Sequence, residues 1–122
     1  SFILDKNLKD AINRAEAYSK AGADAILIHS KENNPSQIFS FSKKFIKSKY
    51  YKPLVAVPSS YSKTYEKELI KNGFKIVIYA NHMMRASYPA MLNVAKSILI
   101  NKRSFNVEKK ISPIKEVINL IK

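Results

Sequence analysis

The stretch Ala21-Gly-Ala-Asp-Ala-Ile-Leu-Ile-His29 decides the fold of this chain. Before it, apolar residues recur at helical spacing over residues 8–18, and Gly22 stands where a residue in the left-handed conformation commonly closes a helix. The apolar run 25–28 that follows is nearly continuous, which is typical of a strand buried on both faces of a parallel sheet. The stretch therefore predicts a helix, a glycine stop and a parallel strand that ends at His29.

A similar unit occurs later in the chain. A second helical pattern ends at Gly73, an apolar run follows at 76–79, and His82 comes shortly after it. A further apolar run, 54–57, lies between the two units and is predicted to form the middle strand. Further helices are expected over 38–46, 63–72, 87–101 and 114–121.

The spacing of the strands indicates the architecture. Their starts lie 29 and 22 residues apart, which suits a repeated β/α fold, either a barrel or a doubly wound sheet. Three strands cannot close a barrel, and a complete (β/α)8 barrel takes about 250 residues. We therefore predict one α/β domain over 1–122, the C-terminal part of a (β/α)8 TIM-type barrel with about three parallel strands and flanking helices. Because the chain begins with Ser1 and the apolar triplet 2–4, we expect an upstream segment.

Composition limits the class of protein. Hydrophobic residues make up 46% of the chain and charged residues 25%, close to the globular average, which indicates a folded chain. Cysteine is absent, which excludes disulfides and thiolate metal sites and suits a reducing cytoplasm. No apolar run approaches the roughly 18 residues that cross a bilayer. We therefore expect a cytoplasmic protein without a membrane partner.

The charge of the chain favours anionic ligands. Lys and Arg number 22 against 9 Asp and Glu, giving a formal net charge of +13. The lysines are spread along the chain, with the densest stretch at 43–52, arginine is scarce, and no basic motif interleaved with aromatic residues occurs. These features disfavour nucleic acid as a partner and leave small anions as suitable ligands. A non-catalytic basic binding or assembly module stays open as an alternative function.

The candidate site residues follow the predicted strands, because parallel β/α folds bind ligands at the carboxyl ends of their strands. They are His29, Ser30, Pro58, Ser59, Asn81 and His82. An imidazole at such a position can donate a hydrogen bond to a phosphoryl or carboxylate oxygen. The alternative is that each histidine bonds a neighbouring loop carbonyl and serves only packing.

Other kinds of site find little support in the sequence. Only Glu32 lies near a strand's carboxyl end, whereas an Mg²⁺ site usually needs several carboxylates, so we predict no metal ligands in this chain. The only two glycines are both explained as helix stops, which leaves no glycine-rich phosphate loop. Ser59 and Ser60 lack the flanking motif of a nucleophile elbow.

Four sequence blocks resemble the phosphoenolpyruvate mutase family of the isocitrate lyase superfamily. They are Arg14-Ala-Glu-Ala-Tyr18, Ala21-Gly-Ala-Asp-Ala-Ile-Leu-Ile-His-Ser-Lys31, Pro53-Leu-Val-Ala-Val-Pro58, and Val77-Ile-Tyr-Ala-Asn-His82 with Arg85-Ala86. The resemblance is specific because these blocks occur in order with appropriate gaps, and it extends from Phe2 to the tail around Glu116.

The resemblance implies a barrel that interconverts phosphoenolpyruvate and phosphonopyruvate with Mg²⁺ bound. It also implies that the metal-binding and nucleophilic aspartates, the gating loop and a substrate-binding arginine lie upstream of the matched region. His29 matches the family's histidine that contacts the phosphoryl group. Pro58 and Ser59, and likewise Asn81 and His82, match segments that line or brace the pocket. The last helices, from Ser87 onward, resemble those exchanged between subunits, which implies a homo-oligomer.

Two related activities compete with the mutase. Phosphonopyruvate hydrolase shares most of these blocks, and the gating loop that separates the two enzymes lies outside the chain. Methylisocitrate lyase-like enzymes match less well at the Ile-His-Ser-Lys and Tyr-Ala-Asn-His blocks. The sequence therefore predicts a phosphoenolpyruvate mutase-like isomerase that is inactive as this chain alone, with the hydrolase as the alternative.

Overall fold

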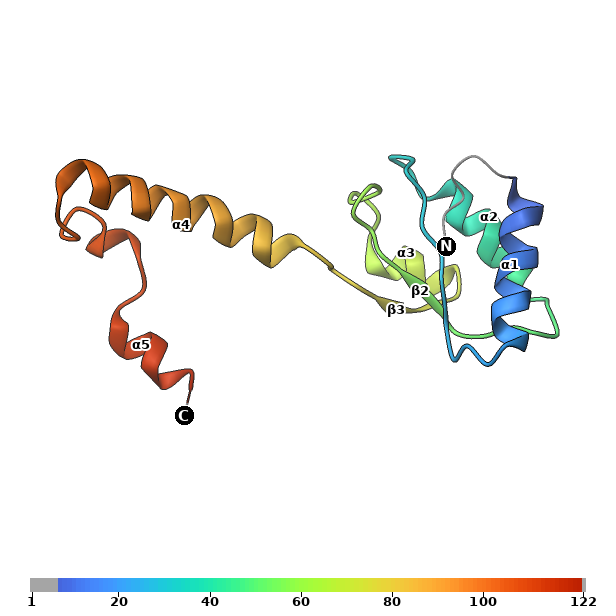
Figure 1. Ribbon diagram of the computed structural model, residues 1–122. Helices are drawn as coiled ribbons and strands as arrows, with labels where there is room; N and C mark the ends of the chain where they lie inside the picture. Colours follow the sequence, from blue (N-terminus) through green and yellow to red (C-terminus); the bar gives the residue numbers. More distant parts are fainter. Residues whose placement is uncertain (1–6, 122) are drawn as a thin grey trace. The chain divides into compact units, whose positions relative to one another are not determined.

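The computed structural model describes residues 7–121, and the chain divides between Ala80 and Asn81 into two compact units (Figure 1). Each unit has its own architecture. The single domain over 1–122 stays a prediction. The apolar triplet 2–4 lies outside the described residues.

The first unit is a three-stranded parallel sheet with helices between the strands. Its elements are α1 (Leu8–Lys20), β1 (Ile26–Leu27), α2 (Ser36–Phe45), β2 (Leu54–Ala56), α3 (Glu66–Lys71) and β3 (Phe74–Val77). Ile26 pairs with Leu54, and Leu54 pairs with Phe74. The next pair joins Val55 to Ile76, so β3 carries one extra residue at this point, a β-bulge. The predicted α/β class with parallel strands and flanking helices is confirmed.

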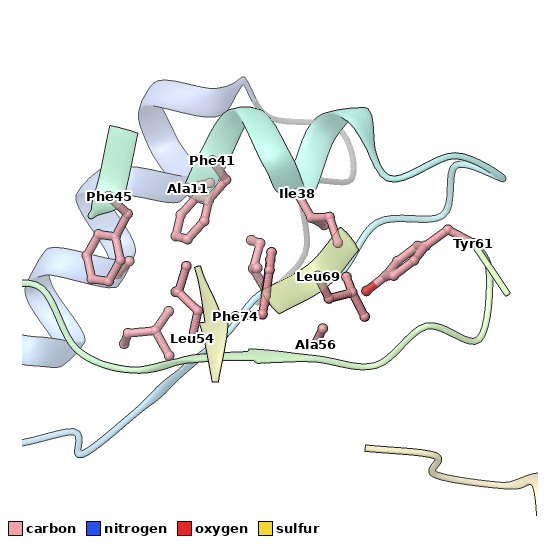
Figure 2. Packing of buried hydrophobic residues seen from close by; sticks show 12 residues of the cluster. Ala11, Ile38, Phe41, Phe45, Leu54, Ala56, Tyr61, Leu69 and Phe74 are labelled. Carbon is pink, nitrogen blue, oxygen red and sulfur yellow. The ribbon is translucent and has the colours of Figure 1, made fainter. Parts of the chain in front are cut away.

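The order of the strands distinguishes the two architectures that the sequence left open. The sheet runs β1-β2-β3, in the order of the sequence, and one continuous core joins the strands to the helices. This core contains Ala11 and Ala15 of α1, Ile38, Phe41 and Phe45 of α2, Leu69 of α3, and Ile26, Ile28, Leu54, Ala56, Tyr61 and Phe74. Figure 2 shows the side chains of α2 meeting those of the sheet in this core. Sequential strands with all helices on one face are the winding of a TIM-type barrel, whereas a doubly wound sheet has helices on both faces.

The opposite face of the sheet is open in the first unit. Leu27 is 38% exposed, Ile76 47% and Ile78 41%, although all three side chains are large and apolar. The sequence predicted that the strand ending at His29 is buried on both faces, and for the residues described this was wrong for β1. The physical reason is that α1, α2 and α3 cover the same face. In a closed barrel the other face lines the interior, where side chains from the remaining strands fill the space.

Both glycines end helices as predicted. Gly22 after α1 has φ +102° and Gly73 after α3 has φ +86°, backbone conformations that residues other than glycine rarely adopt. A Cβ atom at Gly73 would also overlap Cδ1 of Ile46, so the end of this side chain would have to move to make room. At the other end of α1, the side chain of Asn7 accepts a hydrogen bond from the N–H of Asp10 at 3.1 Å.

The second unit contains α4 (His82–Asn101), the 3₁₀-helix η1 (Glu108–Lys110) and α5 (Ile114–Asn119). The helix α4 begins five residues before the predicted start at Ser87, because the carbonyl of Asn81 already accepts a hydrogen bond from the N–H of Arg85 at 3.0 Å. No residue of α4 is buried. None of the helices described within 7–121 is long and apolar enough to cross a membrane.

Candidate functional site

The residues that follow β1 and β2 lie together at the carboxyl edge of the sheet. β1 and β2 are parallel neighbours, so their carboxyl ends face the same side. The backbone N–H of Ile28 still donates to the carbonyl of Val55 beyond the end of β1, at 3.3 Å. Beyond this point the rings of His29 and Tyr61 lie 6.0 Å apart between centroids and are tilted by 43°. The candidate site is therefore built from two separate loops around one imidazole.

His29 has the position that a ligand-binding histidine needs. It forms an isolated β-bridge, which holds its backbone, and its side chain is half-buried. Alternation along the strand places it on the same face as Leu27, the open face of the sheet. Its Nδ1 atom is buried. Direct contact between His29 and a substrate stays a prediction.

Ser30 braces the loop that follows His29. Its side chain is fully buried, and its hydroxyl donates to Oε1 of Gln37 at 2.5 Å. The same hydroxyl oxygen accepts a hydrogen bond from the N–H of Glu32 at 3.1 Å. These two bonds tie the loop to the first turn of α2. Ser30 holds the backbone beside His29, and its predicted contact with the pocket stays a prediction.

The loop after β2 contributes Pro58, Ser59 and Tyr61. Pro58 is buried, Ser59 is half-buried, and the N–H of Ser59 donates to the carbonyl of Val57 at 2.8 Å in a tight turn. Tyr61 is completely buried, and this burial raises the pKa of its hydroxyl. That Pro58 and Ser59 line the pocket stays a prediction.

Sequence reasoning did not single out Tyr61. The signal available was an aromatic residue directly after the polar turn 58–60. Its importance depends on a contact with His29, 32 positions earlier in the chain.

The remaining two candidates, Asn81 and His82, belong to the second unit. Asn81 precedes α4 and His82 is the first residue of this helix. Both side chains are half-buried. Their part in a site with His29 stays a prediction.

The carboxylates of the described part of the chain do not form a site that fits Mg²⁺. Within residues 7–121, no group of three or more His, Cys, Asp or Glu side chains lies close enough to hold a metal ion. Glu32, the acidic residue nearest to the carboxyl edge in the sequence, is exposed. The described carboxylates therefore provide no metal site through which a catalytic step could pass.

The fold and the candidate site together define the class of protein. The chain is part of a β/α-barrel protein, and an imidazole lies at the edge of the sheet where such barrels bind their ligands.

Comparison with known proteins identifies the family. The sequence model of phosphoenolpyruvate phosphomutase matches residues 1–99. A phosphoenolpyruvate phosphomutase of Tetrahymena pyriformis is 42% identical over 120 residues, covering 98% of this chain and 39% of the relative. The crystal structure of a phosphoenolpyruvate phosphomutase from Streptomyces platensis subsp. rosaceus superimposes with a TM-score of 0.81 at 37% identity, covering 93% of this chain and 39% of that one. The chain belongs to the phosphoenolpyruvate phosphomutase family, which confirms the resemblance seen in its sequence.

A second activity is present among the relatives. A phosphonopyruvate hydrolase of Variovorax sp. (strain Pal2) is 36% identical over 113 residues, covering 92% of this chain and 38% of the relative. The chain thus spans about two fifths of the length of the curated relatives it matches, and it corresponds to their C-terminal part.

Proposed function

We propose that this chain forms the carboxyl-terminal part of an isomerase barrel that interconverts phosphoenolpyruvate and phosphonopyruvate. The observation that carries the proposal is the position of His29: half-buried, at the carboxyl edge of the sheet, with Nδ1 turned inward. Membership of the phosphoenolpyruvate phosphomutase family supports the choice of reaction.

The reaction explains why an imidazole is useful at this position. The bond between phosphorus and the enol oxygen of phosphoenolpyruvate breaks, a bond between phosphorus and C3 forms, and the former enol carbon becomes a ketone. No atom is gained or lost. Negative charge lies on the phosphoryl oxygens throughout the transfer, and a donor placed before the reaction stabilises charge there. In our proposal, Nε2–H of His29 donates to one of these oxygens.

The remaining catalytic groups are proposed to come from outside this chain. The resemblance implies Mg²⁺ bound with the substrate, and the residues described within 7–121 do not fit such a site. We propose that the metal ligands and the nucleophilic aspartate belong to the part of the barrel that precedes this chain in its relatives.

Phosphonopyruvate hydrolysis is the second candidate, favoured by the Variovorax relative. Both activities act on a phosphonate with the same phosphoryl group, so His29 suits either one. The products differ: the mutase gives phosphoenolpyruvate, whereas hydrolysis gives pyruvate and inorganic phosphate. The product of the reaction therefore decides between the two.

A chimera tests the proposed function. This chain replaces the matching segment of the Tetrahymena phosphomutase, and the chimera is incubated with phosphonopyruvate and Mg²⁺ while ³¹P NMR follows the products. We expect phosphoenolpyruvate from the chimera and no turnover from the 122-residue chain alone, because the chain lacks a fitting metal site within the described residues. The unaltered Tetrahymena enzyme is the positive control.

Each other outcome has a definite meaning. Release of pyruvate and phosphate would assign the hydrolase activity instead. Turnover by the isolated chain would refute the division of catalytic groups. A chimera that folds, as judged by circular dichroism, but forms neither product would contradict the proposed function. In that case, salt-dependent binding of a polyanion would favour the non-catalytic basic module.

We further propose that the second unit joins two copies of this chain through its helices. A groove of about 650 Å³ is formed by apolar residues of α4 and of the segment that follows it, including Met91, Val94, Ile98, Val107 and Ile111. The apolar side chains Ile114, Val117 and Ile118 of α5, and Ile121 just after it, are exposed and lie at helical spacing. Exposed apolar patches of this kind mark interfaces, and the groove suits the apolar side of such a helix from a second copy.

Sedimentation of single variants tests this assembly. Met91, which lines the groove, is replaced by Glu, and Met83, which is 79% exposed and is not a groove residue, is replaced by Glu as the control. We expect Met91→Glu to weaken the association of two copies about tenfold or more, since it places a charge in an apolar interface, and Met83→Glu to have little effect. A chain that sediments as a monomer at every concentration would contradict the proposal.

A further inference from the structure

We propose that Tyr61 is a positioning residue that fixes the orientation of the His29 imidazole; its effect on catalysis rests on the function proposed above. The proposal adds a residue from a second loop to the site and assigns it a role that does not require contact with the substrate.

Tyr61 is anchored by the core rather than by its own loop. It follows β2 by five residues, yet its side chain has 0% exposure and belongs to the same core cluster as Ala56 and Leu69. Figure 2 shows the ring reaching back from the loop into the core, with the hydroxyl directed toward Leu69. A buried aromatic ring in a close-packed core has few alternative rotamers. Tyr61 therefore provides a rigid surface at the carboxyl edge of the sheet.

The imidazole of His29 lies beside this rigid surface. The centroids of the two rings are 6.0 Å apart and their planes are tilted by 43°, within the range in which aromatic pairs attract each other. Tyr61 lies in the loop after β2, the strand next to β1, so the contact depends on the pairing of β1 with β2. Tyr61 occupies space into which the imidazole would otherwise rotate, and this favours the rotamer seen in the structure.

The orientation matters because the two ring nitrogens of histidine are not equivalent. In this rotamer Nδ1 is buried, and in our proposal Nε2 is the atom that faces the phosphoryl group. Ser30 complements Tyr61, because it fixes the backbone after His29 through its bonds to Gln37 and Glu32. Neighbouring residues thus hold both the main chain and the ring of His29, the arrangement that a precisely placed donor needs.

Nuclear magnetic resonance tests the contact directly. The chain has two histidines, so the ring signals of His29 and His82 can be assigned with a single His29→Ala variant. In the unaltered chain we expect nuclear Overhauser effects between the ring protons of Tyr61 and His29. Tyr61→Met, which keeps an apolar side chain but removes the ring, is expected to shift the His29 signals, whereas Tyr61→Phe is expected to leave them close to their original positions. The His82 signals are the internal reference, and Phe45→Ala, a change in the core on the side away from Tyr61 (Figure 2), is the control for a general loosening of the core.

Kinetics of the chimera test the role. We expect Tyr61→Met to lower kcat between about tenfold and 100-fold, with a smaller change in KM, as for a misplaced catalytic group. In the His29→Ala background the same change is expected to cost little more, because the group that Tyr61 positions is already absent. Tyr61→Phe is expected to retain most of the activity, and Phe45→Ala to act independently of His29.

Two results would overturn the inference: absence of the Tyr61–His29 Overhauser effects in the unaltered chain, or an equal loss from Tyr61→Met whether or not His29 is present. The first measurement is made on the unaltered chain and does not depend on catalysis; it needs the His29→Ala variant only to assign the signals. An inactive but folded chimera would count against the proposed function alone, and the resonance measurements would still decide the role of Tyr61.

Discussion

Replacement of His29 by alanine is expected to lower kcat for the interconversion of phosphonopyruvate and phosphoenolpyruvate about 100-fold to 1,000-fold. The physical reason is the loss of the hydrogen-bond donor that, in our proposal, faces the transferring phosphoryl group. The measurement is the steady-state rate of the chimera with Mg²⁺ at several substrate concentrations. Because the lost bond strengthens as the phosphoryl group moves, we expect kcat to fall more than the affinity for the substrate.

Matched variants separate this role from a structural one. His29→Asn keeps a side-chain N–H donor and is expected to retain more activity than His29→Ala. His82→Ala changes the second histidine, and comparison of the two alanine variants shows which of them the reaction uses. His29 is only half-buried, so the free energy of unfolding should change little. Kinetics equal to those of the unaltered protein would remove His29 from the site.

Replacement of Phe41 by alanine is expected to lower the free energy of unfolding of the first unit by about 3–5 kcal/mol. Phe41 has 0% exposure, and its ring stacks on that of Phe45 at a centroid distance of 5.4 Å. The substitution removes buried apolar surface and leaves a cavity between α2 and the sheet. Urea unfolding, followed by far-ultraviolet circular dichroism, measures the change.

The control for this variant lies in the same unit. Ile70 of α3 is 64% exposed, so Ile70→Ala is expected to change the free energy of unfolding by no more than about 0.5–1 kcal/mol. Similar losses from Phe41→Ala and Ile70→Ala would show that the cluster in Figure 2 is not the core that stabilises this unit.

The local elements of this fold could be predicted from the sequence because their signals are local. Glycine at positions 22 and 73 marks the ends of helices, and both residues have the positive φ that only glycine adopts easily. The apolar runs at 25–28, 54–57 and 76–79 marked the three strands, although the third begins earlier, at Phe74. An apolar run cannot show whether one or both faces of a strand are covered, because the cover comes from distant elements. This is why the open face of the sheet was not foreseen.

The beginnings of two helices were also misplaced for physical reasons. The helix α3 starts at Glu66 rather than at Lys63, because the carboxylate of Glu68 accepts a hydrogen bond from the N–H of Tyr65 at 2.9 Å and caps the helix there. The helix α4 starts at His82 rather than at Ser87, and it continues through Pro89, although proline is favoured only in the first turn of a helix.

The candidate site was predictable where it depended on topology and not where it depended on packing. The rule that ligands bind at the carboxyl ends of parallel strands was enough to select His29. The rule does not indicate which neighbour holds the imidazole in place, since that depends on the pairing of β1 with β2 and on how deeply Tyr61 enters the core.

The unequal cover of the sheet has a consequence for how sequence changes act. On the helix side, a polar substitution at Leu54 or Phe74 disrupts contacts that this chain makes with itself, and its damage is visible in the chain alone. On the other side, a polar substitution at Leu27 or Ile76 breaks few internal contacts and costs little until another part of a barrel closes over it. Residues on the two faces of one strand therefore differ in what limits their substitution. On the helix side the limit is the folding of this chain, and on the other side it is the assembly of the barrel.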